Sequence, residues 1–266
     1  MKKIIIILSA LLLLASCQKD SRFETAEEAV VTFDVQTPVE FEVKSETKGT
    51  GSGTQINALW YGVYHKKGDG SYKYMNDMSA YRTVDNASEK ISVPITLFKD
   101  QEYKIAFIAQ HRSSDGVYTY ILKDGQTVLS EEQFAEMVLN PKAVIANGEQ
   151  LDAFVYWEKT GVIKHDNKKE ITLSRPLAQI NITTTATTKP ASIDVTVKSG
   201  TTQIANFTGL TCSGEHLATV YILPPATGKV TLDLTKYDDD KNIIGTKNIP
   251  GVAVAKNFKT NIQGEI

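Results

Sequence analysis

Short runs in which apolar and polar residues alternate recur along most of this 266-residue chain. The strand-like run EAVVTFDVQ (28–36), for example, includes VTFDV, which sets Val31, Phe33 and Val35 on one face and Thr32 and Asp34 on the other. Such period-two alternation is typical of half-buried β-strands. A helix would instead scatter these apolar residues around its axis. The pattern therefore predicts a chain that folds mainly as β-sheet.

The alternation returns at short intervals between turn signals such as KGDG, KSG, PPATG and YDDDKN. VEFEVK repeats the first pattern with Val39, Phe41 and Val43. Further predicted strands are ALWYGVYHK, SYKYM, KISVPITLF, EYKIAFIAQH, the end of RSSDGVYTYIL, AFVYWEK, RPLAQINI, SIDVTVK, LATVYIL, KVTLDL and KNIIGTKNI. Many short strands with regular turns favour a β-sandwich, and two groups split near Arg175-Pro176 favour two sandwiches in tandem.

Three segments carry more specific expectations. Pro94 has no N–H to donate to a neighbouring strand, so KISVPITLF is predicted to be an edge or bulged strand. EYKIAFIAQH is apolar on both faces and is predicted to be central. SEEQFAEMVLNP (residues 130–141) has a capping box of Ser130 and Gln133 and an apolar stripe, and is predicted to be one short inserted helix.

The first sixteen residues have the features of a signal peptide. Lys2 and Lys3 precede an apolar run, 4–14, that is too short to span a membrane as a helix. Leu14-Ala15-Ser16-Cys17 follows and resembles the lipobox of bacterial lipoproteins. That resemblance implies cleavage before Cys17, attachment of diacylglycerol to its thiol and acylation of the new amino terminus, for instance with palmitate. The alternative is an ordinary secretory signal with a chance cysteine.

Composition and motifs exclude several other classes of function. A formal net charge of −2 lacks the basic surplus that nucleic-acid binding requires. DDDKN at 238–242 fails the EF-hand pattern, because isoleucine occupies the glycine and glutamate positions, and it is interpreted as a solvated hairpin turn. The Cys212 and His216 pair lacks an orienting partner, so Cys212 is interpreted as a small buried residue. We therefore expect no enzyme activity, no metal and no cofactor.

Aromatic residues leave one alternative open. Trp60 and Tyr64 lie with Tyr61, Tyr72 and Tyr74 in one predicted hairpin. Aromatic faces stack on sugars, so Trp60 and Tyr64 are candidate glycan contacts. The competing interpretation is packing in the core and across strands, which aromatic residues on strands usually serve.

Several segments together resemble the Bacteroidia fimbrillin family, the subunits of type V pili and related adhesins. They are the lipobox, the alternating first strand, the Gly-rich loop, LWYGVY, RPLAQINI and the closing NFKTNIQGEI. The most specific parts are RPLAQINI (175–182) and the Asn-x-x-Thr-Asn-Ile-x-Gly pattern (257–264). The resemblance covers nearly all of the mature chain. Neither motif is catalytic.

This resemblance implies an assembly mechanism. Family subunits reach the outer membrane as lipoproteins, and a trypsin-like protease then removes the lipidated segment with its first strand. Another subunit donates a strand to the vacated groove. Here the removable strands would be VTFDV and VEFEVK, and a cut between Lys48 and Gly49 would release them together with Cys17. The family's known cut follows arginine, but cutting at Arg22 would leave the groove filled. A third alternative is an uncleaved, lipid-bound subunit.

The sequence thus predicts an all-β protein with one short inserted helix, built from two tandem transthyretin-like β-sandwich domains. The expected divisions are a signal peptide (1–16), a tether (17–28), an N-terminal domain (29–174) and a C-terminal domain (175–266). The expected function is a fimbrial subunit or adhesin at the outer membrane, cell surface or fimbrium. Its partners would be other pilus subunits and an unidentified host or bacterial surface ligand. The C-terminal GVAVAKNFKTNIQGEI would either rearrange to donate a strand or belong to a receiving or terminal subunit. The alternative function is a glycan-binding surface lipoprotein that does not polymerise.

Overall fold

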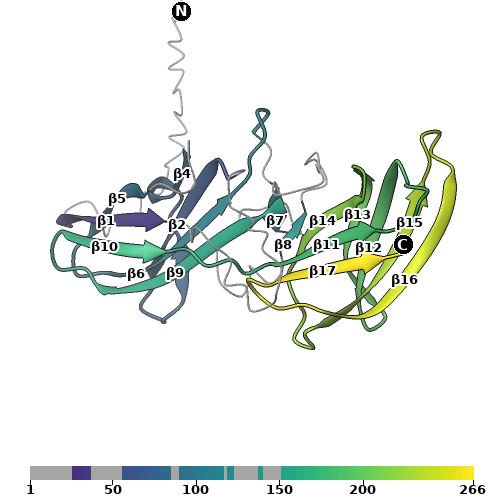
Figure 1. Cartoon of the computed structure of the whole chain (residues 1–266). Coiled ribbons are helices and arrows are strands. Elements are labelled where there is room, and N and C mark those ends of the chain that lie inside the picture. The colour runs from purple at the N-terminus through teal and green to yellow at the C-terminus, as the bar shows by residue number, and fades with distance from the viewer. Residues whose placement is uncertain (1–25, 37–55, 85–89, 117–118, 123–136, 140–150) are drawn as a thin grey trace, which may run out of the picture.

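The computed structural model describes residues 26–36, 56–84, 90–116, 119–122, 137–139 and 151–266. Within these ranges most of the backbone forms strands and their connections, and the named helical element is a 3-10 turn, η2 (Asn76–Met78). The strands gather in two groups along an elongated molecule (Figure 1). The expected all-β architecture is confirmed.

The first group holds the strands that precede Leu173. They are β1 (Glu28–Gln36), β2 (Ala58–Lys66), β3 (Tyr72–Tyr74), β4 (Ala80–Thr83), β5 (Ile91–Phe98), β6 (Glu102–Gln110), β7 (Tyr120–Leu122), β8 (Met137–Leu139), β9 (Ala153–Val162) and β10 (Asn167–Thr172). One sheet has the order β10-β1-β5, and a larger one has the order β3-β2-β6-β9 with β4 also paired to β2. β7 and β8 form a separate ladder.

The two larger sheets enclose a hydrophobic core. Alternate residues of β1 and β5 face alternate residues of β2 and β6, as the sequence pattern requires. The members of this core with no exposed surface are Phe33, Leu59, Val63, Val93, Leu97, Ile105, Phe107 and Phe154. The opposite face of β2 and β6 is buried as well, which fits the continuous runs ALWYGVY and IAFIA.

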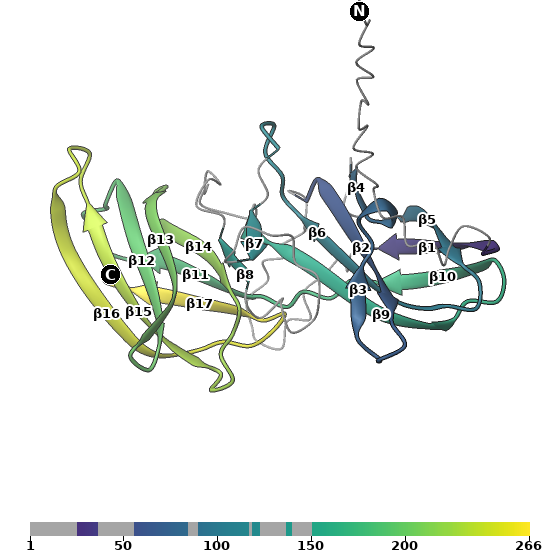
Figure 2. The same cartoon turned by 180° about the vertical axis from the view of Figure 1, so that it is seen from behind.

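The second group runs from Ala178 to Gly264. Its strands are β11 (Ala178–Thr184), β12 (Ser192–Ser199), β13 (Thr202–Thr211), β14 (His216–Ile222), β15 (Lys229–Tyr237), β16 (Ile243–Ala253) and β17 (Lys259–Gly264). They form a sheet of order β14-β11-β17 and a sheet of order β13-β12-β15-β16. In Figure 2 the same group is seen from behind, with β16 and β15 along its outer side.

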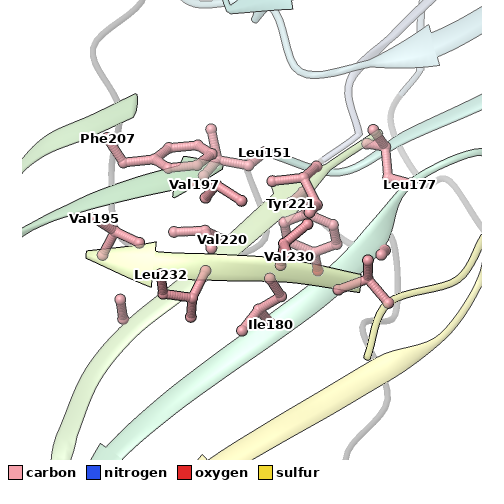
Figure 3. Packing of buried hydrophobic residues seen from close by; sticks show 14 of the residues in the cluster. Leu151, Leu177, Ile180, Val195, Val197, Phe207, Val220, Tyr221, Val230 and Leu232 are labelled. Carbon is pink, nitrogen blue, oxygen red and sulfur yellow. The ribbon is translucent and has the colours of Figure 1, made fainter. Parts of the chain in front are cut away.

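The side chains between these two sheets make the second core. Val195, Val197, Phe207, Val220 and Leu232 have no exposed surface, and Figure 3 shows them converging from β12, β13, β14 and β15. Leu151 and Leu177 belong to the same cluster, which continues onto the second face of β2 and β6. Among the described strands, no ladder joins the first group to the second.

Several local predictions can be compared directly with the strands. β1 has the bounds of the predicted run EAVVTFDVQ. β5, which contains Pro94, pairs only with β1 and is an edge strand, as expected. β6 lies between β2 and β9 and is central, as expected. The 238–242 turn joins the antiparallel strands β15 and β16, so its hairpin interpretation is confirmed.

The predicted helix over 130–141 is wrong at its C-terminal end. Met137–Leu139 is the strand β8, which pairs with β7, while Ser130, Gln133 and Phe134 lie outside the described residues. A single amphipathic segment of this length is below the size at which helices become stable alone. Pairing with Tyr120–Leu122 therefore outweighs the helical pattern. The predicted domain boundary at 174/175 falls in the connection between β10 and β11.

Candidate functional site

The place of β1 in its sheet is the main candidate site. β1 runs antiparallel to β5, with Val31 opposite Ile95, and parallel to β10, with Val31 opposite Asn167. It therefore has a hydrogen-bonded neighbour on each side. We call the space that β1 fills between β5 and β10 the β1 slot.

One face of β1 forms part of the core. Ala29, Val31, Phe33 and Val35 are each at most 1% exposed. The ring of Phe33 lies 5.2 Å from that of Phe107 on β6, at an interplanar angle of 57°. Full burial of each large apolar side chain contributes roughly 1.5–3 kcal/mol, so the slot is a strong apolar binding site for an alternating strand.

The other face of β1 carries a buried carboxylate between two lysines. Asp34 lies opposite Ser92 of β5 and beside Glu170 of β10. Its Oδ2 is 2.9 Å from Lys168 Nζ and 3.4 Å from Lys90 Nζ, and Lys90 also contacts Glu170. The hydrogen bond from Lys168 lowers the pKa of Asp34, with a smaller contribution from Ser92. The slot thus favours a carboxylate at this position.

The ends of β1 are held by further contacts. The Val30 N–H donates to Asp166 Oδ1 at 2.8 Å, and the Leu173 N–H donates to the Gln36 carbonyl at 2.8 Å. The Lys99 ammonium lies 2.9 Å from Glu27 Oε2. These contacts fix the register of β1 on both neighbours.

The described structure covers only part of the predicted removable segment. Val31, Phe33 and Val35 lie in the slot. Cys17, Arg22, the second run (Val39, Phe41 and Val43) and the expected cut at Lys48 and Gly49 lie outside the described residues. The cut and the lipid therefore stay predictions.

The expectation of glycan contact at Trp60 and Tyr64 does not fit the structure. Their exposed fractions are 7% and 6%, and both belong to a hydrophobic cluster. The Tyr64 ring packs 5.3 Å from that of Tyr74, and a Cβ at Gly62 would meet the Trp60 ring at 2.2 Å. Burial also raises the pKa of Tyr64. Rings packed this closely have no face open to a sugar, because β2 is buried on both sides.

Cys212 and His216 do not form a nucleophile pair. The Cys212 sulfur lies 3.6 Å from the Leu217 carbonyl oxygen, and burial raises the pKa of its thiol to about 11. His216 Nε2 is 2.9 Å from Thr219 Oγ1. Burial, and then the charge of Lys259, lower the pKa of His216. A thiol with so high a pKa is almost entirely protonated near neutrality.

A buried polar cluster, which the sequence does not reveal, joins the two most family-specific motifs. Arg175 donates from Nε to Asp152 Oδ1 at 2.7 Å and from Nη2 to Oδ2 at 2.6 Å. Its Nη1 donates to Asn257 Oδ1 at 3.2 Å, and its guanidinium lies 4.5 Å from the Phe154 ring centre. RPLAQINI and the Asn257 motif then continue as the parallel pair β11 and β17. The motifs therefore mark a structural junction.

Metal binding and membrane crossing can be judged for the described part of the chain. No group of three or more His, Cys, Asp or Glu side chains there is arranged to hold a metal ion. None of its helical segments combines the length and the apolar character that crossing a membrane requires.

Comparison with protein families gives two matches. A model described as "Family of unknown function (DUF6562)" matches residues 23–205, which is more than half of the chain. A model described as "Prokaryotic membrane lipoprotein lipid attachment site" matches residues 1–18, which include Cys17. No curated protein matches the chain significantly.

Similar solved structures include three fimbrial proteins. A fimbrial assembly protein from Parabacteroides distasonis is 14% identical, with 91% of this chain and 92% of that chain covered and a TM-score of 0.44. The fimbrial anchor protein Mfa2 from Porphyromonas gingivalis is 14% identical, with coverages of 84% and 83% and a TM-score of 0.43. The tip fimbrial protein Mfa3 from the same organism is 7% identical, with coverages of 84% and 81% and a TM-score of 0.43. Because these TM-scores lie below 0.5, the function of this chain has to be inferred from its own residues.

Proposed function

The chain belongs to DUF6562, a family of unknown function, and from its own residues we propose that it is a fimbrial subunit or adhesin of the outer membrane surface. It is exported with a signal peptide and acylated at Cys17, within the segment that matches a lipid attachment site. Stable membrane anchoring takes at least two acyl chains, a condition that a triacylated cysteine meets. Residues 29–174 and 175–266 then act as two tandem domains.

The observation that carries assembly by strand exchange is the position of β1 between β5 and β10. Removal of residues up to Lys48 takes away β1 and leaves two strand edges facing each other across an empty apolar groove. Unpaired backbone groups and bare apolar surface are both unfavourable, so the groove recruits an extended strand from another subunit. The chain is thus a receiving subunit.

The charged outer face adds selectivity. Loss of Asp34 leaves the ammonium groups of Lys90 and Lys168 without this partner. An incoming strand with a carboxylate at that position restores the ion pairs, whereas a lysine there meets two like charges. The preferred donor strand is therefore alternating, apolar on one face and acidic near the middle of the other.

Limited trypsin treatment of the mature chain tests this assembly. The protein carries Cys17→Ser so that it stays free of lipid, and polymers are detected as a ladder on an unheated denaturing gel. Trypsin can also cut after Lys44, so all of these proteins carry Lys44→Gln as well. We expect a ladder from this protein and from its Arg22→Gln variant, and none from its Lys48→Gln variant. A ladder from Lys48→Gln would overturn the cut at Lys48, and absence of a ladder from every variant would overturn polymerisation.

A further inference from the structure

The sequence contains a second segment with the pattern that fills the β1 slot. Val31–Val35 reads VTFDV, and Val39–Val43 reads VEFEV. Both have valine, phenylalanine and valine at alternate positions, with a carboxylate between the last two. The two segments are eight residues apart, and a shift by an even number keeps the same side chains on the same face of a strand.

Three of the four apolar positions of the slot would receive identical side chains. In the shifted register Val39, Phe41 and Val43 take the places of Val31, Phe33 and Val35. The position beside Phe107, which the Phe33 ring fills in the structure, would again hold a phenylalanine ring. Because interiors are close-packed, an exchange of identical side chains leaves neither void nor overpacking.

The electrostatic requirement is met as well. Glu42 takes the place of Asp34, opposite Ser92 and between Lys90 and Lys168. A glutamate is one methylene longer than an aspartate, and flexible lysine side chains on both sides accommodate the difference. Charge complementarity therefore favours this segment over a neutral or basic one.

Two positions explain why Val31–Val35 occupies the slot in the structure. Pro38 would replace Val30, whose N–H donates to Asp166 Oδ1, and a proline has no N–H to donate. Thr37 would replace Ala29, which is 1% exposed, and would bring a hydroxyl group into the core. The shifted register is therefore the less stable of the two.

We propose that the β1 slot accepts Val39–Val43 of the same chain in place of Val31–Val35. The shift inserts eight residues between Cys17 and the sheet, which lengthens the tether by roughly 26 Å when extended. This exchange within one chain does not depend on cleavage or on polymerisation.

Disulfide trapping in the full mature chain distinguishes the two registers. Cys17→Ser and Cys212→Ser remove the natural thiols. Ser92→Cys is then combined with Asp34→Cys for the observed register or with Glu42→Cys for the shifted one. Residues directly opposite in an antiparallel pair have Cα atoms about 4.5–5.5 Å apart, within disulfide range. Ser45→Cys with Ser92→Cys is the matched control, because Ser45 lies beyond the slot in both registers.

We expect the intrachain disulfide at Glu42→Cys to form at least tenfold more than at Ser45→Cys in a thiol redox buffer. Phe33→Ala should raise that yield, and Phe41→Ala should lower it. Equal yields at positions 42 and 45 would overturn the proposal. Disulfides that form only between two copies of the chain would also overturn the proposal. They would mean that Val39–Val43 enters the β1 slot of another molecule.

Stability measurements provide a test without cysteines. If Phe41 can replace Phe33, then Phe33→Ala should lower the free energy of unfolding by less than the loss of a buried phenylalanine usually does. Phe41→Ala alone should change it little. The double variant should then lower the unfolding midpoint by more than the two single shifts together. Additive shifts would contradict the exchange.

Discussion

The Arg175 guanidinium donates two hydrogen bonds to the Asp152 carboxylate, and both side chains are fully shielded from solvent. The pair fastens the connection between β10 and β11 to the start of β9. Asn257, which precedes β17, accepts a third bond from the same guanidinium. One arginine therefore links segments from the middle and the end of the chain.

Arg175→Met should destabilise the protein by about 3–5 kcal/mol, because it leaves the buried Asp152 carboxylate without its counter-ion. Urea unfolding measures the change. Arg175→Met combined with Asp152→Leu should recover part of the loss, since neither charge then remains buried. If Arg175→Met alone changes the free energy of unfolding by less than about 0.5 kcal/mol, the result would contradict a buried ion pair.

Gly62→Ala should destabilise by about 1–3 kcal/mol through overpacking, because the new Cβ would meet the Trp60 ring at 2.2 Å. Gly68→Ala is the matched control, since a Cβ there meets nothing within 4 Å. Urea unfolding followed by tryptophan fluorescence compares the two. Equal stability of both variants would mean that the Trp60 ring is free to move, as a glycan platform would require.

Asp34 should contribute to stability in a pH-dependent way. Its pKa is lowered in the folded protein, chiefly by the hydrogen bond from Lys168. The contribution is therefore fully present above the unfolded pKa of about 3.9 and is lost as the pH falls through the folded value. The difference between the unfolding midpoints of the parent protein and Asp34→Asn should be largest near pH 7 and should shrink at low pH. If the difference between these midpoints grows as the pH falls, the ion pairs of Asp34 are contradicted. Asp239→Asn, which changes an aspartate at an exposed turn, is the control.

Cys212 should react slowly with iodoacetamide. With a pKa of about 11 it has roughly a hundredfold less thiolate at pH 8 than an ordinary cysteine. A variant with Cys212→Ser and Ser213→Cys places the thiol at an exposed position for comparison. His216→Ala should leave the rate at Cys212 unchanged within about twofold. If His216→Ala greatly slows the alkylation of Cys212, the two residues would act as a nucleophile pair after all.

The sequence predicts those parts of the fold that depend on local pattern. The bounds of β1, the edge position of β5 and the burial of both faces of β6 follow from alternation, Pro94 and a continuous apolar run. β13 was not predicted, because only Phe207 and Leu210 along it are buried, Gly209 has a φ of 65°, and its pairing with β12 shifts register twice. Met137–Leu139 was assigned to a helix because its pairing partner could not be known.

The candidate site was predictable on its apolar side only. Val31, Phe33 and Val35 identify a buried strand from their spacing. The parallel pairing of β1 with β10 joins residues 136 positions apart, from Gln36 to Thr172, and no local pattern signals it. Without that register, Lys168 and Lys90 are ordinary surface lysines, and their convergence on Asp34 remains invisible. The ion pair of Arg175 and Asp152 could not be predicted either, because no local pattern signals which distant residues meet.

Amide hydrogen exchange on trypsin-assembled polymers tests strand exchange most directly, when combined with N-terminal sequencing of the same material. Strand exchange at the β1 slot predicts chains that begin at Gly49 and lack β1, in which β5 and β10 are nevertheless as protected as in the uncut protein. In cut monomers the same two strands should exchange quickly. Polymers whose chains begin before Val30, or in which the β5 and β10 amides exchange quickly, would contradict strand exchange.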